Sequence, residues 1–113
     1  MDKNLKGKIV LIEYPYTDLS GSKLRPALVL YDRDYDVVLA FITSRLYMYN
    51  EETDVLIKSD SPEFKSTGLE KDSIIKLDKI FTISKEKIKK IIGEVSDNLK
   101  NEINRKLQKI LML

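Results

Sequence analysis

The chain has 113 residues, 42% apolar and 34% charged, with a net charge of +2, so we expect one small domain over residues 1–113. Cysteine and histidine are both absent, which excludes disulfides and thiolate chemistry and removes the commonest zinc ligands. No apolar run approaches the ~20 residues of a membrane span, and MDKNLKGK lacks the apolar stretch of a secretory signal, so we expect a cytoplasmic protein.

The first part of the chain alternates between strand-forming and turn-forming segments. KIVLIEY at 8–14 is rich in Ile and Val and predicts a strand, whereas PYTDLSGSKL at 15–24 predicts a loop. Two further apolar runs, at 27–31 and 36–42, flank a short polar turn. We therefore expect these two runs to form a β-hairpin.

The middle of the chain continues the pattern of short strands. Residues 53–58, 72–77 and 79–83 are strand candidates, and residues 45–52 and 59–68 are predicted loops. Several short strands at close spacing are typical of a small barrel. The sequence thus predicts a mainly β protein.

The C-terminal part is predicted to be helical. Ser96 can cap a helix, and apolar residues recur every three or four positions after it, at Leu99, Ile103, Leu107, Ile110 and Leu111. Residues 84–95 allow two interpretations. They can form a helix that starts at Ser84 and stops at Gly93, or one helical turn followed by a strand through IIGEV.

One cationic side chain precedes the first predicted strand of the hairpin, and two hydroxyl side chains follow the second. Arg25 directly precedes Pro26, which biases Arg25 toward an extended conformation at the start of one strand. The neighbouring strand ends in Thr43 and Ser44. These side chains can form a site, although a surface ion pair for Arg25 and backbone hydrogen bonds for the hydroxyls are the plainer alternatives.

Four segments, taken in order, resemble the MazF/PemK toxin family, which includes Kid and shares its fold with CcdB. They are GKIVLIEY, RPALVL, the strand ending in ITS, and GLEKDSIIKLDKIFTI. The resemblance implies an SH3-like barrel with a C-terminal helix, and it favours the turn and strand for residues 84–95. It also implies a sequence-specific, metal-independent endoribonuclease that cleaves single-stranded RNA without a cofactor. The implied partner is an antitoxin with a disordered, acidic segment.

The resemblance also implies catalytic roles. RNA supplies the 2′-OH as nucleophile, and an Arg matches the oxygens of the phosphate under attack. Arg25 is then the main catalytic residue and Thr43 its partner. Asp78 corresponds to an Asp implicated in the Kid branch and is the first candidate for the base. Asp18 is the second candidate and Glu13 the third.

RNA-binding roles follow in the same way. Lys76 stands where the Kid branch has an Arg, and it shares a strand face with Asp78 if both lie on one strand. A salt bridge between Lys76 and Asp78 is the competing interpretation. The resemblance adds Lys23, Ser44 and Asp18 to the RNA-binding set.

Two departures from the family pattern keep other functions open. The loop DLSGSKL lacks the Glu and Gln that often precede the Arg-Pro pair, and Phe81 stands where many members have an Arg. Both differences favour either a CcdB-like toxin that binds a protein such as DNA gyrase, or an RNA-binding module without catalysis.

The last four residues, Ile110 to Leu113, are all apolar. Four successive residues of a helix cannot all face one side, so some must contact a second surface. Since the family dimerises, we expect a C2 homodimer with this segment near its interface.

Overall fold

The computed structural model describes residues 4–13 and 23–113. In chain order the elements are β1 (Lys8–Glu13), β2 (Leu24–Asp32), β3 (Asp36–Thr43), the 3-10 turn η1 (Leu46–Met48), β4 (Asp54–Ile57), α1 (Phe64–Thr67), β5 (Ser73–Ser84), the 3-10 turn η2 (Lys85–Lys87), β6 (Ile88–Glu94) and α2 (Asp97–Leu111). The predicted mainly β fold with a C-terminal helix is confirmed.

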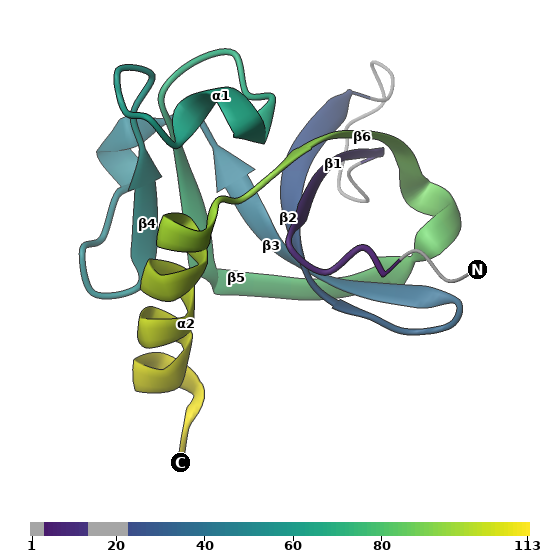
Figure 1. Cartoon of the computed structure of the whole chain (residues 1–113). Coiled ribbons are helices and arrows are strands. Elements are labelled where there is room, and N and C mark those ends of the chain that lie inside the picture. The colour runs from purple at the N-terminus through teal and green to yellow at the C-terminus, as the bar shows by residue number, and fades with distance from the viewer. Residues whose placement is uncertain (1–3, 14–22) are drawn as a thin grey trace.

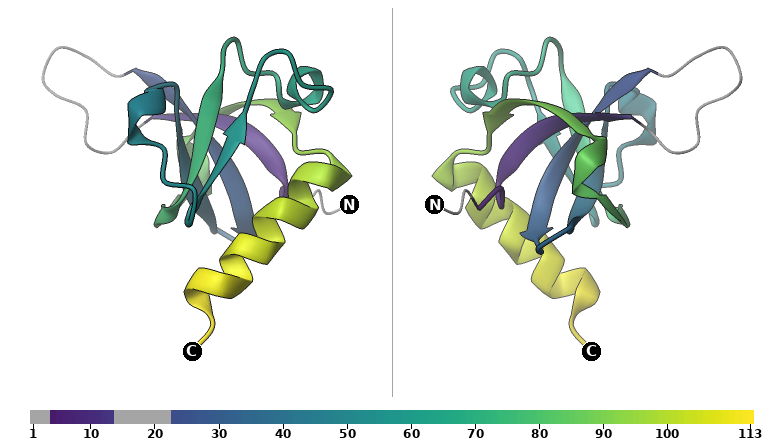
Figure 2. Two further views of the ribbon diagram at one scale, coloured as in Figure 1. Left: turned by 90° about the vertical axis from the view of Figure 1, so that its left-hand side faces the viewer. Right: turned by 90° about the vertical axis from the view of Figure 1, so that its right-hand side faces the viewer.

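The six strands form one antiparallel sheet in the order β4-β5-β3-β2-β1-β6. Figures 1 and 2 show this sheet curling into a small barrel with α2 packed on its outside. The two edge strands, β4 and β6, do not pair with each other. The barrel is therefore open along one side.

The segment after β4 packs tightly against β6 and narrows this opening. Gly68, which ends α1, has a φ of 74°, and a Cβ there would overlap the backbone carbonyl of Ile92. A Cβ at Gly93 would likewise overlap the carbonyl of Ser66. Only glycine permits so close an approach of the two backbones.

Two apolar clusters hold the sheet. One lies between the sheet and α2 and includes Ile42, Ile75, Leu99 and Ile103, and the other lies inside the curl and includes Val10, Ala27, Val29 and Leu39. The alternation of β3 explains the division, because Ile42 and Leu39 point to opposite faces of the strand. Both faces of β3 are thus buried.

Two predicted boundaries were wrong. The candidates at 72–77 and 79–83 are one strand, β5, because Ala40 pairs with Ile80 while the next residue, Phe41, pairs with Lys76. The residues between Lys76 and Ile80 form a bulge that bends β5 without ending it. The predicted loop at 59–68 contains α1.

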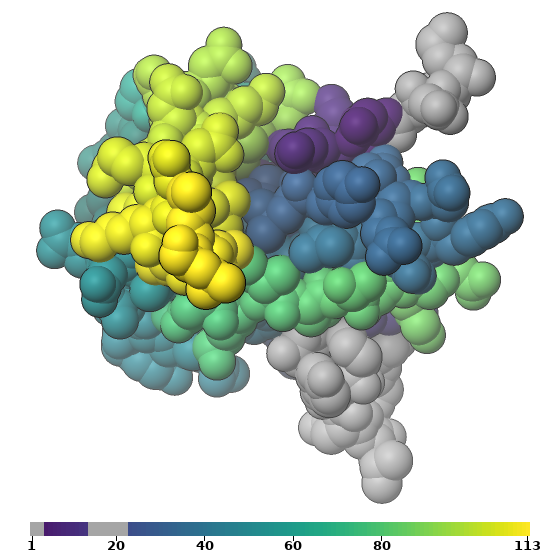
Figure 3. Space-filling model, turned by 90° about the horizontal axis from the view of Figure 1, so that it is seen from below, coloured from purple at the N-terminus to yellow at the C-terminus, as the bar shows by residue number. Residues whose placement is uncertain are grey.

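The C-terminal helix has the predicted start. The Ser96 hydroxyl accepts a hydrogen bond from the Leu99 amide at 3.2 Å, and most of the predicted apolar stripe faces the core. Leu111 is an exception, because 57% of it is exposed. Figure 3 shows α2 and the last residues at the surface beside β5. Within the described ranges, no helix is long and apolar enough to cross a bilayer.

Candidate active site

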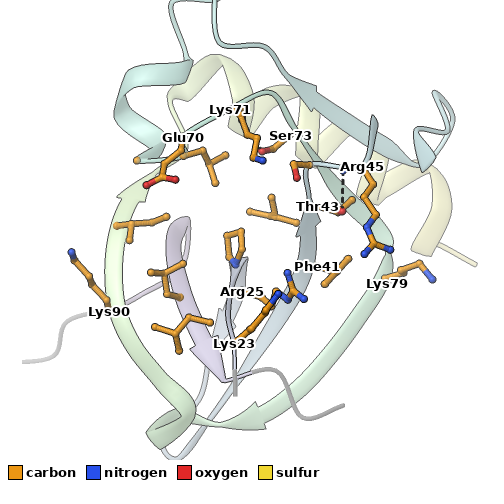
Figure 4. A pocket seen from close by; sticks show the side chains of 18 of the residues that line it. Lys23, Arg25, Phe41, Thr43, Arg45, Glu70, Lys71, Ser73, Lys79 and Lys90 are labelled. Atoms are coloured by element: carbon orange, nitrogen blue, oxygen red, sulfur yellow. Dashed lines mark hydrogen bonds between the residues drawn. The ribbon is translucent and has the colours of Figure 1, made fainter. Parts of the chain in front are cut away.

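A groove with a volume of about 1040 Å³ opens at one end of the sheet. Its walls come from residues 23–26 around the start of β2, residues 41–45 at the end of β3, residues 68–71 after α1, and residues 90–92 of β6. The strand ends of the hairpin therefore face the glycine contact between α1 and β6 across this groove (Figure 4).

The groove is strongly basic. Among its described lining residues, Glu70 is the one acid, and the bases are Lys23, Arg25, Arg45, Lys71, Lys79 and Lys90. Six cations around one concave surface concentrate positive potential there, although the whole chain carries a net charge of only +2. The groove is thus suited to a polyanion.

Arg25 and Thr43 lie at corresponding positions of adjacent strands. In the β2–β3 pairing, Val29 is opposite Leu39 and Ala27 is opposite Phe41. Continuing this register by two residues places Arg25 across from Thr43, so both side chains belong to the same face of the sheet. The predicted association of these two residues follows from strand register. Arg25 is the second residue of β2, at the start of the strand as predicted.

The Thr43 hydroxyl is oriented by its own loop. Its oxygen accepts a hydrogen bond from the Arg45 amide at 3.1 Å, drawn as the dashed line in Figure 4. This bond occupies one lone pair and leaves the O–H hydrogen free to donate to a ligand in the groove. Thr43 is only 9% exposed, and the surface that it does expose belongs to the groove lining.

The other predicted site residues lie in different places. Lys23 and Ser44 are exposed and line the groove beside Arg25 and Thr43. Lys76 and Asp78 are not among the lining residues. Lys76 is 4% exposed, and its Nζ lies 3.6 Å from Asp78 Oδ1 and 2.6 Å from Asp54 Oδ2.

The candidates for the base therefore stay predictions. Asp78 is on the bulge of β5, with 42% of its side chain exposed. Asp18 lies outside the described residues. Glu13, at the end of β1, faces Lys89 at 3.6 Å.

Several groove residues escaped the sequence analysis: Phe41, Arg45, Lys71, Lys79 and Lys90. Arg45 and Phe41 had a local signal, because each is two residues from Thr43 along the chain. The three lysines had none. They come from separate segments that only the curled sheet brings to one surface (Figure 4).

Two acids outside the groove lining, Asp32 and Glu94, are paired with lysines. A hydrogen bond from Lys85 lowers the pKa of Asp32, and the Leu5 amide adds to this effect. A hydrogen bond from Lys8 similarly lowers the pKa of Glu94. Both carboxylates are therefore ionised at neutral pH and engaged away from the groove.

Comparison with known proteins identifies the class of molecule. Residues 5–111 match the family of PemK-like, MazF-like toxins of type II toxin–antitoxin systems, so the chain belongs to this family. This confirms the resemblance found in the sequence. A search of curated proteins gives no significant match.

Solved structures support the fold. An endoribonuclease in complex with its cognate antitoxin, from a mycobacterial species, has a TM-score of 0.70 at 22% identity, covering 95% of this chain and 93% of that one. The Mycobacterium tuberculosis toxin MazF-mt6 has a TM-score of 0.70 at 19% identity, covering 90% and 93%. A further mycobacterial endoribonuclease has 0.67 at 23% identity, covering 96% and 91%.

Proposed function

We propose that this protein is a toxin endoribonuclease that cleaves single-stranded RNA in the cytoplasm by attack of the 2′-OH on the adjacent phosphate. The observation that carries the proposal is the placement of Arg25 opposite Thr43 in a groove with six cations. RNA brings its own nucleophile, so the protein has to bind the backbone and stabilise the charge of the transition state.

The groove cations and Thr43 have separate roles in this proposal. The Arg25 guanidinium offers a planar fork of donors to the non-bridging oxygens as charge develops on them. The Thr43 hydroxyl, already accepting from the Arg45 amide, donates its hydrogen to the same phosphate. The lysines and Arg45 hold neighbouring phosphates. Products carry a 2′,3′-cyclic phosphate and a 5′-OH.

Two protein partners are part of the proposal, each at a different surface. The type II antitoxin is proposed to place a disordered, acidic segment in the basic groove, since opposite potentials favour association. A second copy of the chain is proposed to dimerise with it through a C2 axis near the exposed C-terminal residues. We further propose that the RNA groove then lies across the dimer, with an Arg25 from each subunit beside it.

The test uses purified protein and a long single-stranded transcript. Cleavage is mapped first, and the ribose at the mapped site is then replaced by deoxyribose. We expect cutting of the ribose substrate in EDTA, a cyclic phosphate at the new 3′ end, and no cutting of the deoxy substrate. Cutting of the deoxy substrate, or loss of activity in EDTA, contradicts the 2′-OH mechanism.

RNA binding without cleavage is the second candidate function. Glu70 is the single acid among the described lining residues, and Asp78 does not line the groove, so a base is not evident there. Binding that persists with intact RNA after long incubation supports this alternative. Absence of binding to any RNA instead favours a CcdB-like toxin that acts on a protein.

A further inference from the structure

A buried ion pair lies next to the groove but outside its lining. Lys76 of β5 is 4% exposed, Asp54 of β4 is 0% exposed, and their Nζ and Oδ2 atoms are 2.6 Å apart. Buried ion pairs are expensive to desolvate, and apolar residues of similar size commonly stabilise a fold equally well. The pair therefore calls for an explanation other than stability.

Nearly all the remaining hydrogen bonds of this pair go to the loop between β3 and β4. Lys76 Nζ donates to the Met48 carbonyl at 3.0 Å. Asp54 accepts from the Asn50 amide at 2.8 Å and from the Thr53 hydroxyl at 2.8 Å. Both charged groups thus bind the loop of residues 44–53 through hydrogen bonds.

A continuous chain of hydrogen bonds leads from this pair to the groove. Lys76 binds the Met48 carbonyl, and the Met48 amide donates to the Arg45 carbonyl at 3.0 Å. The Arg45 amide in turn donates to the Thr43 hydroxyl at 3.1 Å. The path ends at Arg45 and Thr43, two of the groove residues to which a phosphate contact is assigned above.

Lys76 has at most one N–H donor that is not hydrogen-bonded within the described structure. An ammonium group has three N–H donors. One is used by Asp54 and one by Met48, and the third side of the group faces Asp78 Oδ1 at 3.6 Å. Direct phosphate binding by Lys76 would have to use this last donor, which faces Asp78, on a residue that is only 4% exposed.

We propose that the Lys76–Asp54 pair is a positioning device that fixes the loop of residues 44–53, and through it Arg45 and Thr43, for the reaction. Its catalytic consequence rests on the proposed ribonuclease activity. Its structural consequence, an ordered loop, does not. The two consequences can therefore be tested separately.

The test variant removes both charges together, since removing one would leave the other buried and unpaired. It combines Lys76→Met with Asp54→Asn, and Lys76→Met with Asp54→Leu is the second variant if the first does not fold. Lys8→Met is the matched control. It also deletes one ammonium from a 2.6 Å ion pair, with Glu94, but that pair is at the surface and outside the groove.

The first measurement is amide hydrogen exchange without RNA. Loss of the anchoring bonds should speed exchange at the Arg45 and Met48 amides by about 10- to 100-fold relative to wild type. Lys8→Met should leave both rates unchanged. Unchanged exchange in the charge-free variant overturns the proposal, whether or not the protein cuts RNA.

The second measurement is a double-mutant cycle with Arg45→Ala. Misplacement of the groove residues should slow single-turnover cleavage by about 100-fold. If the pair acts through the Arg45 side chain, removing the pair in the Arg45→Ala background should have a smaller effect, since coupled residues are not additive. The part that acts on Thr43 passes through the Arg45 backbone amide and should remain in this background.

The salt dependence of RNA binding distinguishes a positioning role of Lys76 from direct contact with phosphate. A lost phosphate contact lowers the slope of log binding constant against log salt by about 0.7 on single strands. In the Arg45→Ala background, removal of the pair should leave this slope unchanged. Additive rate losses together with a further drop in slope would show that Lys76 binds phosphate itself, and would overturn the proposal. A wild-type protein that cuts no RNA would contradict the proposed function and leave the exchange result decisive for the loop.

Discussion

The Arg25→Ala substitution should separate an effect on catalysis from an effect on folding. The side chain is exposed, and it makes no salt bridge to any residue in the described ranges. Its backbone is already held in β2 between β1 and β3. Truncation therefore removes a charged donor without opening a cavity.

The expected magnitudes differ sharply. Exposed substitutions that break no cap, core contact or ion pair usually change the free energy of unfolding by less than about 0.5 kcal/mol. Loss of one preorganised donor to a developing oxyanion slows a reaction by about 100- to 1,000-fold, equivalent to about 2.7–4 kcal/mol of transition-state stabilisation. Cleavage should fall by this factor while the urea midpoint stays close to that of wild type.

Two control variants test why Arg25→Ala loses cleavage activity. Arg33→Ala also removes one exposed cation, but from the β2–β3 turn outside the groove, and it should cleave normally. Arg25→Lys keeps the charge but loses the planar fork, so it should recover part of the activity only. The assay is single-turnover cleavage of an end-labelled single-stranded RNA at saturating protein.

A wild-type rate in Arg25→Ala would refute the assignment of Arg25 to the reacting phosphate. A large loss of stability would refute a different step, the inference that this side chain is free of structural contacts. Equal losses in Arg25→Ala and Arg33→Ala would mean that total charge, and not the groove geometry, governs the rate.

Three further predictions test other parts of the structure. Thr43→Ala should slow cleavage less than Arg25→Ala, because it removes a neutral donor, and a larger loss in the same assay would contradict the assigned roles. Gly68→Ala should lower the free energy of unfolding by at least about 1–3 kcal/mol in a urea titration, because φ is 74° and the Ile92 carbonyl occupies the Cβ position. The lowered pKa of Asp32 contributes stability that is present above its unfolded pKa and is lost as pH falls through the folded value, so Asp32→Asn should flatten the acid side of the stability curve.

Local sequence signals predicted the elements that depend on local chemistry. Ile- and Val-rich runs predicted the strands, and Ser96 predicted the start of α2. Local signals could not predict that β5 is one continuous strand. The polar residues near Asp78 resemble a turn, and only pairing with β3 on both sides shows that the strand bends and continues. α1 was missed because its four residues are too short to show periodicity.

Those site residues that lie at strand ends could be predicted from the sequence. Arg25 and Thr43 emerge from a predicted hairpin, so their association follows from register. The partner of Lys76 was not predictable, because Asp54 is 22 residues away in the chain and the notable neighbour in sequence was Asp78. Spacing on a strand indicates a shared face, but it does not show which of several acids lies close enough to pair.

The basic groove shows why overall charge is a weak guide to the ligand of a small domain. Lysines are placed on the groove from β6, the loop after α1 and the bulge of β5, while Asp32, Asp54 and Glu94 are paired with lysines elsewhere. Ion pairs with lysines engage these three acids outside the groove. The curling of the sheet brings cations that are distant in sequence to one surface. A chain with a net charge of only +2 thus has a groove with six cations and one acid among its described lining residues. Because such a surface attracts phosphates through unpaired charges, its affinity for RNA should be strongly dependent on salt.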